Sequence, residues 1–315
     1  MRFFLFLLVL SAGVVTTGCA TLTPYSEVRA GLPPENLVEI DGRSVYVEDG
    51  GAEGSAADEP PVVFVHGFGA SSYAWRDVVD LLPERHTVAF DLYGFGWTER
   101  PPGLVPYTRQ GQVELLRALL DHLGVERADL VGHSYGGSVS VAFAIAHPER
   151  LRSLTLVDSA HPEYPRRRRS RLARWRPVVD LYLGWALKPK RVQKALERSL
   201  ADDSLATPEL AEAYLERLAV EGARHAFRGL SAELPEGVSD GPPIDLPQVT
   251  VPTLLLWGEE DVLITVEDGR RSAERIPCHR FVPIPNAGHL PMEERPEAVA
   301  EALREFLVDP AGACE

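Results

Sequence analysis

The stretch Ala128-Asp129-Leu130-Val131-Gly132-His133-Ser134-Tyr135-Gly136-Gly137 decides the fold of this chain. Residues 128–131 are a largely apolar run typical of a buried strand, and residues 138–146 predict a helix. The glycines around Ser134 lack the Cβ atoms that would clash where the chain turns from strand to helix within about two residues. Such a turn exposes the Ser134 hydroxyl above a sheet, and the helix N-terminus behind it favours developing negative charge. The stretch therefore predicts a nucleophilic serine between a strand and a helix.

A second motif, His66-Gly67-Phe68-Gly69, follows the strand-like residues 61–65. A strand that ends in this way places the backbone N–H of Phe68 at the carboxyl edge of the sheet. Together with the N–H of Tyr135, it would form an oxyanion hole for a tetrahedral intermediate. An ordinary glycine turn is the alternative interpretation. We expect the side chain of His66 to be structural rather than catalytic.

The candidate general base is His289, in the loop Asn286-Ala287-Gly288-His289-Leu290-Pro291 after the strand-like residues 279–283. A histidine on a glycine loop late in the chain suits a base that reaches across to the serine. It also needs a carboxylate to orient its ring, so a complete site requires an acid as well.

The acid that we assign is Asp261, which lies in a loop after the apolar residues 253–257. Glu259 and Glu260 are its neighbours and are alternatives on composition alone. Asp158, at the end of the strand-like residues 154–157, is another alternative acid. With Asp261 the catalytic residues occur in the order Ser, Asp, His, which differs from the orders of chymotrypsin and subtilisin.

These motifs together resemble the α/β-hydrolase superfamily, in particular its single-domain, capped branch of esterases and carbon–carbon bond hydrolases. The resemblance implies a serine hydrolase. A serine nucleophile distinguishes the chain from haloalkane dehalogenases and epoxide hydrolases, which resemble it but use aspartate. Carbon–carbon bond hydrolases favour asparagine where His133 stands, so the chain departs from them there. The matching segments are residues 62–72, 91–96, 129–160 and 251–307.

The order of apolar runs predicts an α/β fold, with a mostly parallel sheet flanked by helices and an inserted helical cap. Strand-like and helix-like segments alternate after an opening hairpin around Asp41-Gly42-Arg43, and residues 160–248 interrupt that rhythm. A cap at that place would cover the active site and select the substrate. The division that we expect is a signal peptide (1–18), a tether (19–36), the core (37–159 and 249–309), the cap (160–248) and a tail (310–315).

Composition agrees with a folded enzyme and argues against nucleic acid as a partner. The chain has 315 residues, 45% of them hydrophobic, and a formal net charge of −14, which argues against nucleic acid. We recognise no zinc-type spacing, phosphate loop or dinucleotide fingerprint, so no metal or cofactor is expected. The sequence leaves the oligomeric state open.

Seven arginines fall within residues 166–176 of this otherwise acidic chain. A solvated cap helix is one interpretation, and a surface that rests against anionic lipid headgroups is a second. A third is the steering of an acidic substrate.

The N-terminus predicts export. Arg2 and the apolar residues 3–10 are followed by small residues and Thr16-Thr17-Gly18-Cys19, which resembles a bacterial lipoprotein signal with Cys19 as the lipidated residue. Ala20 after the cysteine favours the outer membrane; cleavage elsewhere would release a soluble secreted enzyme. Cys278 and Cys314 then remain, and the sequence leaves open whether they pair.

Together these features predict a serine enzyme of the cell envelope that hydrolyses small to medium carboxylic esters. A carbon–carbon bond hydrolase, an amidase and a cofactor-free haloperoxidase would keep the same triad. A non-catalytic envelope protein that binds through its cap is the alternative from another class.

Overall fold

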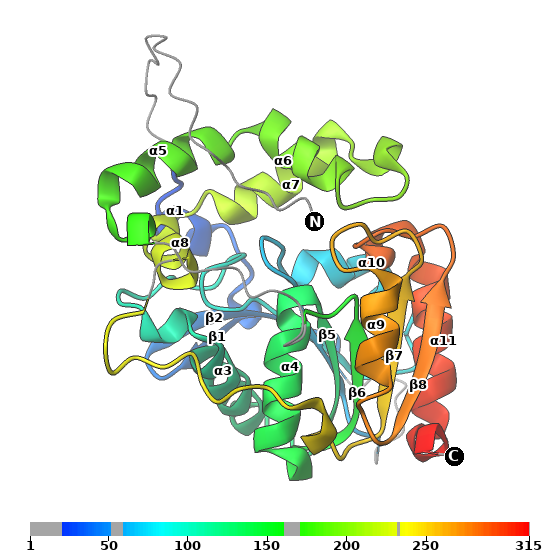
Figure 1. Ribbon diagram of the computed structural model, residues 1–315. Coiled ribbons are helices and arrows are strands. Elements are labelled where there is room, and N and C mark those ends of the chain that lie inside the picture. Colours follow the sequence, from blue (N-terminus) through cyan, green and yellow to red (C-terminus); the bar gives the residue numbers. More distant parts are fainter. Residues whose placement is uncertain (1–20, 52–58, 161–170, 232–233, 315) are drawn as a thin grey trace.

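The computed structural model describes residues 21–51, 59–160, 171–231 and 234–314, without the side chains of Arg171 and Arg174 (Figure 1). Its centre is an eight-stranded sheet in the order β1-β2-β4-β3-β5-β6-β7-β8. The strands are β1 (Leu37–Ile40), β2 (Arg43–Asp49), β3 (Val62–Val65), β4 (Thr87–Phe90), β5 (Ala128–His133), β6 (Leu151–Val157), β7 (Thr253–Gly258) and β8 (His279–Ile284).

The sheet is antiparallel at one edge and parallel elsewhere. β1 and β2 form the expected hairpin, whose turn residues Asp41 and Gly42 have φ of 49° and 71°. β2 pairs antiparallel with β4, and every neighbouring pair from β4 to β8 is parallel. The carboxyl ends of the parallel strands therefore meet at one edge, where the residues after β3, β5, β6, β7 and β8 gather. The predicted α/β architecture is confirmed.

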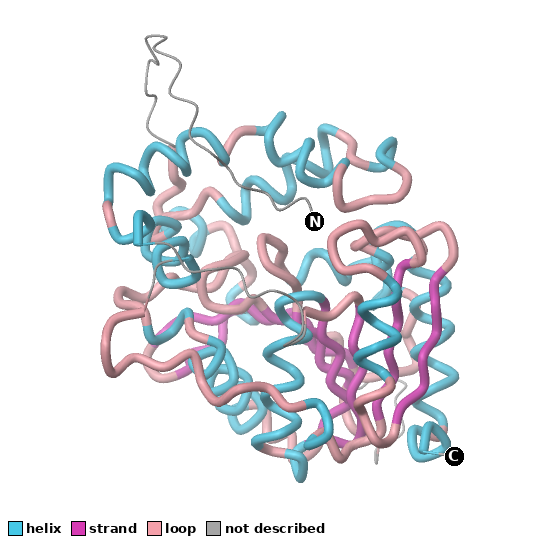
Figure 2. Tube along the Cα trace, viewed as in Figure 1, coloured by secondary structure: helices cyan, strands magenta, loops and turns pink. Residues whose placement is uncertain are grey.

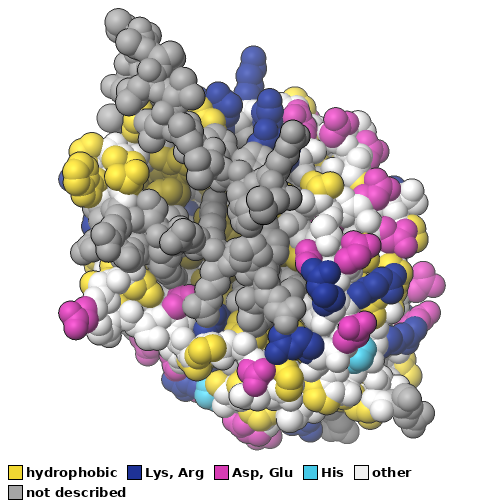
Figure 3. All heavy atoms as spheres, in the orientation of Figure 1, with side chains coloured by type: hydrophobic (Ala, Val, Ile, Leu, Met, Phe, Trp, Pro, Cys, Tyr) yellow, Lys and Arg dark blue, Asp and Glu magenta, His cyan; other side chains and the backbone are white. Residues whose placement is uncertain are grey.

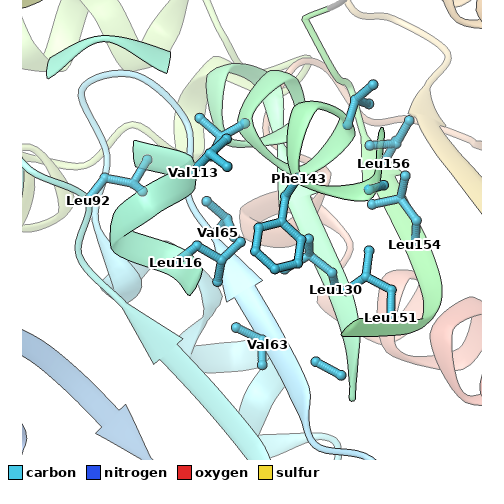
Figure 4. Packing of buried hydrophobic residues seen from close by; sticks show 14 of the residues in the cluster. Val63, Val65, Leu92, Val113, Leu116, Leu130, Phe143, Leu151, Leu154 and Leu156 are labelled. Atoms are coloured by element: carbon cyan, nitrogen blue, oxygen red, sulfur yellow. The ribbon is translucent and has the colours of Figure 1, made fainter. Parts of the chain in front are cut away.

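Helices cover both faces of the sheet because successive strand residues point to opposite sides. Val63 and Val65 of β3 pack toward α3 (Arg109–His122), α4 (Ser134–Ala146) and α9 (Val266–Ala273), a layer that Figure 4 shows in part. Val62 and Phe64 pack toward the other face. The helices there are α2 (Arg76–Asp80), α10 (Pro291–Glu294) and α11 (Pro296–Val308).

A helical cap is inserted between β6 and β7 and lies over the carboxyl edge of the sheet (Figures 1 and 2). Its described helices are α5 (Arg176–Ala186), α6 (Pro189–Glu197), α7 (Pro208–Leu218) and α8 (Ala223–Ser231). Tyr214 of α7 donates a 2.7 Å hydrogen bond to Glu293 of α10, and Arg76 of α2 binds both oxygens of the same carboxylate. One buried carboxylate thus ties the cap to the core.

The N-terminal segment expected as a tether is folded where the structure describes it. α1 (Tyr25–Ala30) follows Thr23, which forms an isolated parallel bridge with Val220 of the cap. Its N–H donates to Ala219, and its carbonyl accepts from Glu221. Among the described residues, none of the helices is long and apolar enough to cross a bilayer.

The pairing that the sequence left open is present in the structure. Cys278 and Cys314 form a disulfide with a Cα–Cα distance of 4.3 Å. It fastens the C-terminal 3-10 helix (Pro310–Cys314) beside β8.

Candidate active site

Ser134 occupies a sharp turn between β5 and α4. Its φ is 49°, in the left-handed region that non-glycine residues rarely adopt. The turn fits because its neighbours are glycines: a Cβ on Gly136 would overlap the carbonyl oxygens of Val65 and His66 at the end of β3. The helix N-terminus can therefore pack directly against the neighbouring strand. The Ser134 side chain emerges at the carboxyl edge of the sheet, on the side of the cap.

The structure brings Ser134, Asp261 and His289 together in one hydrogen-bonded chain. Nε2 of His289 lies 3.0 Å from Oγ of Ser134, and Nδ1 lies 2.7 Å from Oδ2 of Asp261. The other oxygen of Asp261 accepts the backbone N–H groups of Leu263 and Ile264 at 2.7 and 3.0 Å. Since the carboxylate is fixed at both oxygens, it can hold the imidazole in the tautomer that accepts the serine proton at Nε2.

None of the alternative acids makes the hydrogen bond to Nδ1 of His289, which Asp261 makes. Glu259 and Glu260 are exposed, whereas Asp261 is 4% exposed. Asp158 is fully buried after β6 and accepts the N–H of Gly258 at 3.0 Å through Oδ1, while its Oδ2 meets no hydrogen-bond partner among the described residues. Burial and the adjacent Asp261 hold the pKa of the Asp158 carboxyl well above its usual range. Asp158 is thus suited to be a neutral neighbour of the triad.

Asp158, Asp261 and His289 form the single group of three that could hold a metal ion by distance within the described parts of the chain. Their ligand atoms lie within 4.8 Å of one another. Nδ1 of His289 and Oδ2 of Asp261 are hydrogen-bonded to each other, as a general base and its orienting acid are.

The loop after β3 lies against the serine turn. A Cβ on Gly67 would come 3.2 Å from Cβ of Ser134, so Gly67 and Phe68 pass directly beside the nucleophile. The ring of Phe95 contacts the Phe68 ring at 5.4 Å and the Tyr135 ring at 6.4 Å between centroids. The two residues expected to supply the oxyanion hole therefore flank Ser134.

His66 holds this loop in place. Its Nδ1 lies 2.8 Å from the Gly67 carbonyl, and its Nε2 accepts the backbone N–H of Leu92 at 3.0 Å. The contact with Leu92 requires the neutral ring with its proton on Nδ1, and burial lowers the pKa of His66. This is the structural role expected from the sequence.

Three interactions around His289 were not predicted from the sequence. Its N–H donates to the carbonyl of the cap residue Ser199 at 2.6 Å, and its carbonyl accepts from Nε2 of His133 at 2.8 Å. Burial lowers the pKa of His133 well below its usual value, so this donor is a neutral imidazole. The neighbouring Gly288 donates its N–H to the carboxylate of Glu294.

Glu294 extends this contact to the cap. Its Oε2 accepts Gly288 N–H at 2.5 Å, and its Oε1 accepts the N–H groups of Ala201 and Asp202 at 2.7 and 3.1 Å. Although Glu294 is visible in the sequence as part of an acidic pair after His289, nothing local distinguishes it from Glu293. Its partners lie 92 and 93 positions away in the chain.

Comparison with known proteins agrees with this geometry. Residues 60–296 match the family model of the alpha/beta hydrolase fold. The chain belongs to this family. It is 31% identical over 279 residues to the uncharacterized hydrolase YugF of Bacillus subtilis, covering 88% of this chain and 98% of that protein.

Two solved structures of the family are similar over most of their length. An esterase from Thermogutta terrifontis is 29% identical with a TM-score of 0.68, covering 87% of this chain and 99% of the esterase. A membrane phospholipase A, described as a bacterial virulence factor, is 28% identical with a TM-score of 0.68, covering 87% of this chain and 85% of the phospholipase chain. The family and its hydrolase chemistry are therefore shown, while the substrate differs among its members.

Two of the sequence-based candidates fall outside the described residues. Cys19, the expected lipidation site, precedes residue 21, and Arg166–Arg169 belong to the undescribed segment 161–170. Of the arginine run, the side chain described is that of Arg176, which is exposed and lies 3.7 Å from Asp180.

Proposed function

We propose that this protein hydrolyses carboxylic esters through an acyl-enzyme formed on Ser134. The observation that carries the proposal is the unbroken hydrogen-bond chain from Ser134 through His289 to Asp261. A similar esterase structure supports the choice of ester among the substrates of the family.

The reaction would proceed in two halves. His289 accepts the proton of Ser134 as the hydroxyl oxygen attacks the ester carbonyl, and Asp261 stabilises the resulting imidazolium. His289 then gives that proton to the leaving alcohol, whose departure leaves the acyl group on Ser134. Water, deprotonated by His289, attacks the acyl-enzyme, and return of the proton to Ser134 releases the carboxylic acid.

The oxyanion would lie between the backbone N–H groups of Phe68 and Tyr135. The packing of Gly67 against Ser134 supports this, because it leaves the loop after β3 adjacent to the attacked carbonyl. A donor of this kind contributes about 3–4 kcal/mol to transition-state stabilisation in comparable enzymes. We expect small and medium acyl groups to be preferred over long-chain triglycerides, since the cap covers the site.

Labelling with a fluorophosphonate tests the nucleophile. The wild type should be labelled on Ser134 and lose activity, while Ser134→Ala should keep its fold, remain unlabelled and hydrolyse no ester. An active Ser134→Ala variant would refute the mechanism. Turnover of a panel of esters of graded acyl length, beside amides and a carbon–carbon bond substrate, identifies the reaction. A clear preference for the amide, for the carbon–carbon bond substrate or for emulsified triglyceride would contradict the proposed substrate class.

We also propose that the protein is lipid-anchored through Cys19 in the bacterial envelope, with the outer membrane favoured. The Cys278–Cys314 disulfide supports export, because such bonds persist in oxidising compartments. Mass spectrometry of the mature N-terminus tests the anchor: the first residue should be an acylated Cys19, and Cys19→Ser should abolish the modification. An unmodified N-terminus at another residue would contradict it and favour a soluble secreted enzyme.

A further inference from the structure

The cap carries large apolar side chains that remain partly exposed in the described part of the fold. Ten large hydrophobic residues are exposed in the described chain, and five of them lie within residues 172–185. On α5, Val178, Leu181, Tyr182 and Trp185 are spaced by three or four residues and so share one face of the helix. Val179 and Leu183, one position further on, supply the separate stripe that packs into the protein.

Basic residues outnumber acidic ones in the part of the chain that carries this stripe. Residues 172–196 contain six lysines and arginines and one acid, in a chain whose net charge is −14. That acid, Asp180, is shared between Arg176 of the same helix and Arg224 of α8, and it pairs with none of the cations of α6. At the junction of α5 and α6 the guanidinium of Arg191 lies 4.4 Å from the centre of the Trp185 ring. Figure 3 shows hydrophobic side chains over the α5 end of the cap and Lys and Arg side chains at its top.

The N-terminal part of the chain is attached to the same cap. Thr23 pairs with Val220, and Tyr25 donates its N–H to Glu221, so the first described residues of the chain are attached to the cap. Thr23 lies four positions after Cys19, a span of at most about 14 Å when fully extended. A lipid on Cys19 would therefore hold the cap close to the bilayer surface.

We propose that the exposed stripe of α5 and the cations of α6 form a docking surface for anionic phospholipid. Leu181, Tyr182 and Trp185 would enter the headgroup boundary, where aromatic and aliphatic side chains replace water contacts. Lys190 and Lys194 on α6 would face lipid phosphates. A second copy of this chain fits less well, because a symmetric contact would set cations against cations. This docking surface is separate from the proposed active site. The proposed lipid on Cys19 serves only to bring the cap to the membrane.

Quenching of tryptophan fluorescence by brominated acyl chains tests this surface. The processed chain is placed on vesicles of phosphatidylcholine with or without phosphatidylglycerol. Of the five tryptophans, Trp75 and Trp257 are fully buried and Trp97 is half-buried, whereas Trp175 and Trp185 are 66% and 38% exposed and can report contact with lipid. We expect strong quenching with phosphatidylglycerol, loss of most of it in Trp175→Phe/Trp185→Phe, and weak quenching with phosphatidylcholine alone.

Matched variants separate the surface from general effects. Lys190→Gln/Lys194→Gln should reduce quenching to the phosphatidylcholine level, while Arg280→Gln/Arg304→Gln removes the same charge from the core and should not. Leu181→Gln should also reduce quenching, and Val308→Gln, at an 82% exposed position of α11, should not. All variants should hydrolyse a water-soluble ester like the wild type.

Other results would overturn the proposal. Equal quenching on vesicles with and without phosphatidylglycerol would exclude recognition of anionic lipid. Equal quenching in Lys190→Gln/Lys194→Gln and in its control Arg280→Gln/Arg304→Gln would exclude it as well. A changed kcat/KM for the soluble ester in Leu181→Gln, with quenching unaltered, would show that the stripe lines the substrate path. A dimer that Leu181→Gln dissociates would show that a second copy covers it. Because the readout does not require turnover, failure of the esterase proposal would be seen separately.

Discussion

The backbone N–H of His289 donates to the backbone carbonyl of Ser199 in the cap at 2.6 Å. The cap therefore holds the loop of His289 in place together with the core. Gly288 leaves no room for a side chain, since a Cβ there would come 2.6 Å from the same carbonyl. The cap thus helps to position the imidazole as well as covering the site.

Glu294 tests this coupling, because its two oxygens accept N–H groups from the histidine loop and from the cap. The amide of Glu294→Gln has one accepting oxygen, so it loses the hydrogen bonds either to the histidine loop or to the cap. We expect kcat for a soluble ester to fall about 10²-fold, the cost of a misplaced catalytic group, with little change in KM. Glu297→Gln, at an exposed position of α11, is the control. A change confined to KM, or to stability, would show that Glu294 does not position His289.

The assignment of the acid can be tested by comparing two isosteric variants. Asp261→Asn should reduce kcat about 10⁴-fold, since the amide cannot orient the imidazole as the carboxylate does. Asp158→Asn should stay close to wild type, because the amide resembles the neutral carboxyl that burial favours at that position. Steady-state rates with one soluble ester measure both. The reverse pattern would assign the acid to Asp158.

The parts of the site that could be predicted from sequence are those that short motifs determine. The glycines around Ser134 and the loop of His289 are local signals, and the apolar runs beside them predicted the parallel sheet. Contacts between distant segments could not be predicted in this way. Glu294 meets Ala201 from 93 positions away, and its sequence neighbour Glu293 has different partners. The bridge between Thr23 and Val220 likewise has no local signal.

The buried histidines predict how stability depends on pH. His66 is hydrogen-bonded as the neutral ring, and its pKa is lowered in the folded state. Below about pH 6.5 the unfolded chain binds a proton at this histidine that the folded chain does not, so the free energy of unfolding should fall as pH decreases. His133 acts in the same direction. Urea unfolding at a series of pH values measures this contribution when the wild type is compared with a variant that lacks the histidine.

His66→Gln should weaken that pH dependence in the same urea experiment, while the exposed His122→Gln should leave it unchanged. The variant is expected to be less stable at neutral pH, because the contacts to Gly67 and Leu92 are altered. The informative quantity is therefore the slope of stability against pH below about 6.5. An unchanged slope in His66→Gln would contradict a neutral, buried His66.

The disulfide should stabilise the fold without contributing to catalysis. It closes a loop between residues 36 positions apart, and the loss of chain entropy in the unfolded state for such a loop corresponds to about 3–4 kcal/mol. Cys314→Ser should lower the free energy of unfolding by about that amount, and reduction of the wild type should have the same effect. Cys278 precedes β8, at the end of the strand opposite the carboxyl edge where Ser134, Asp261 and His289 lie, so kcat should not change while the protein is folded. A loss of activity without a loss of stability would mean that β8 transmits strain to the His289 loop at its end.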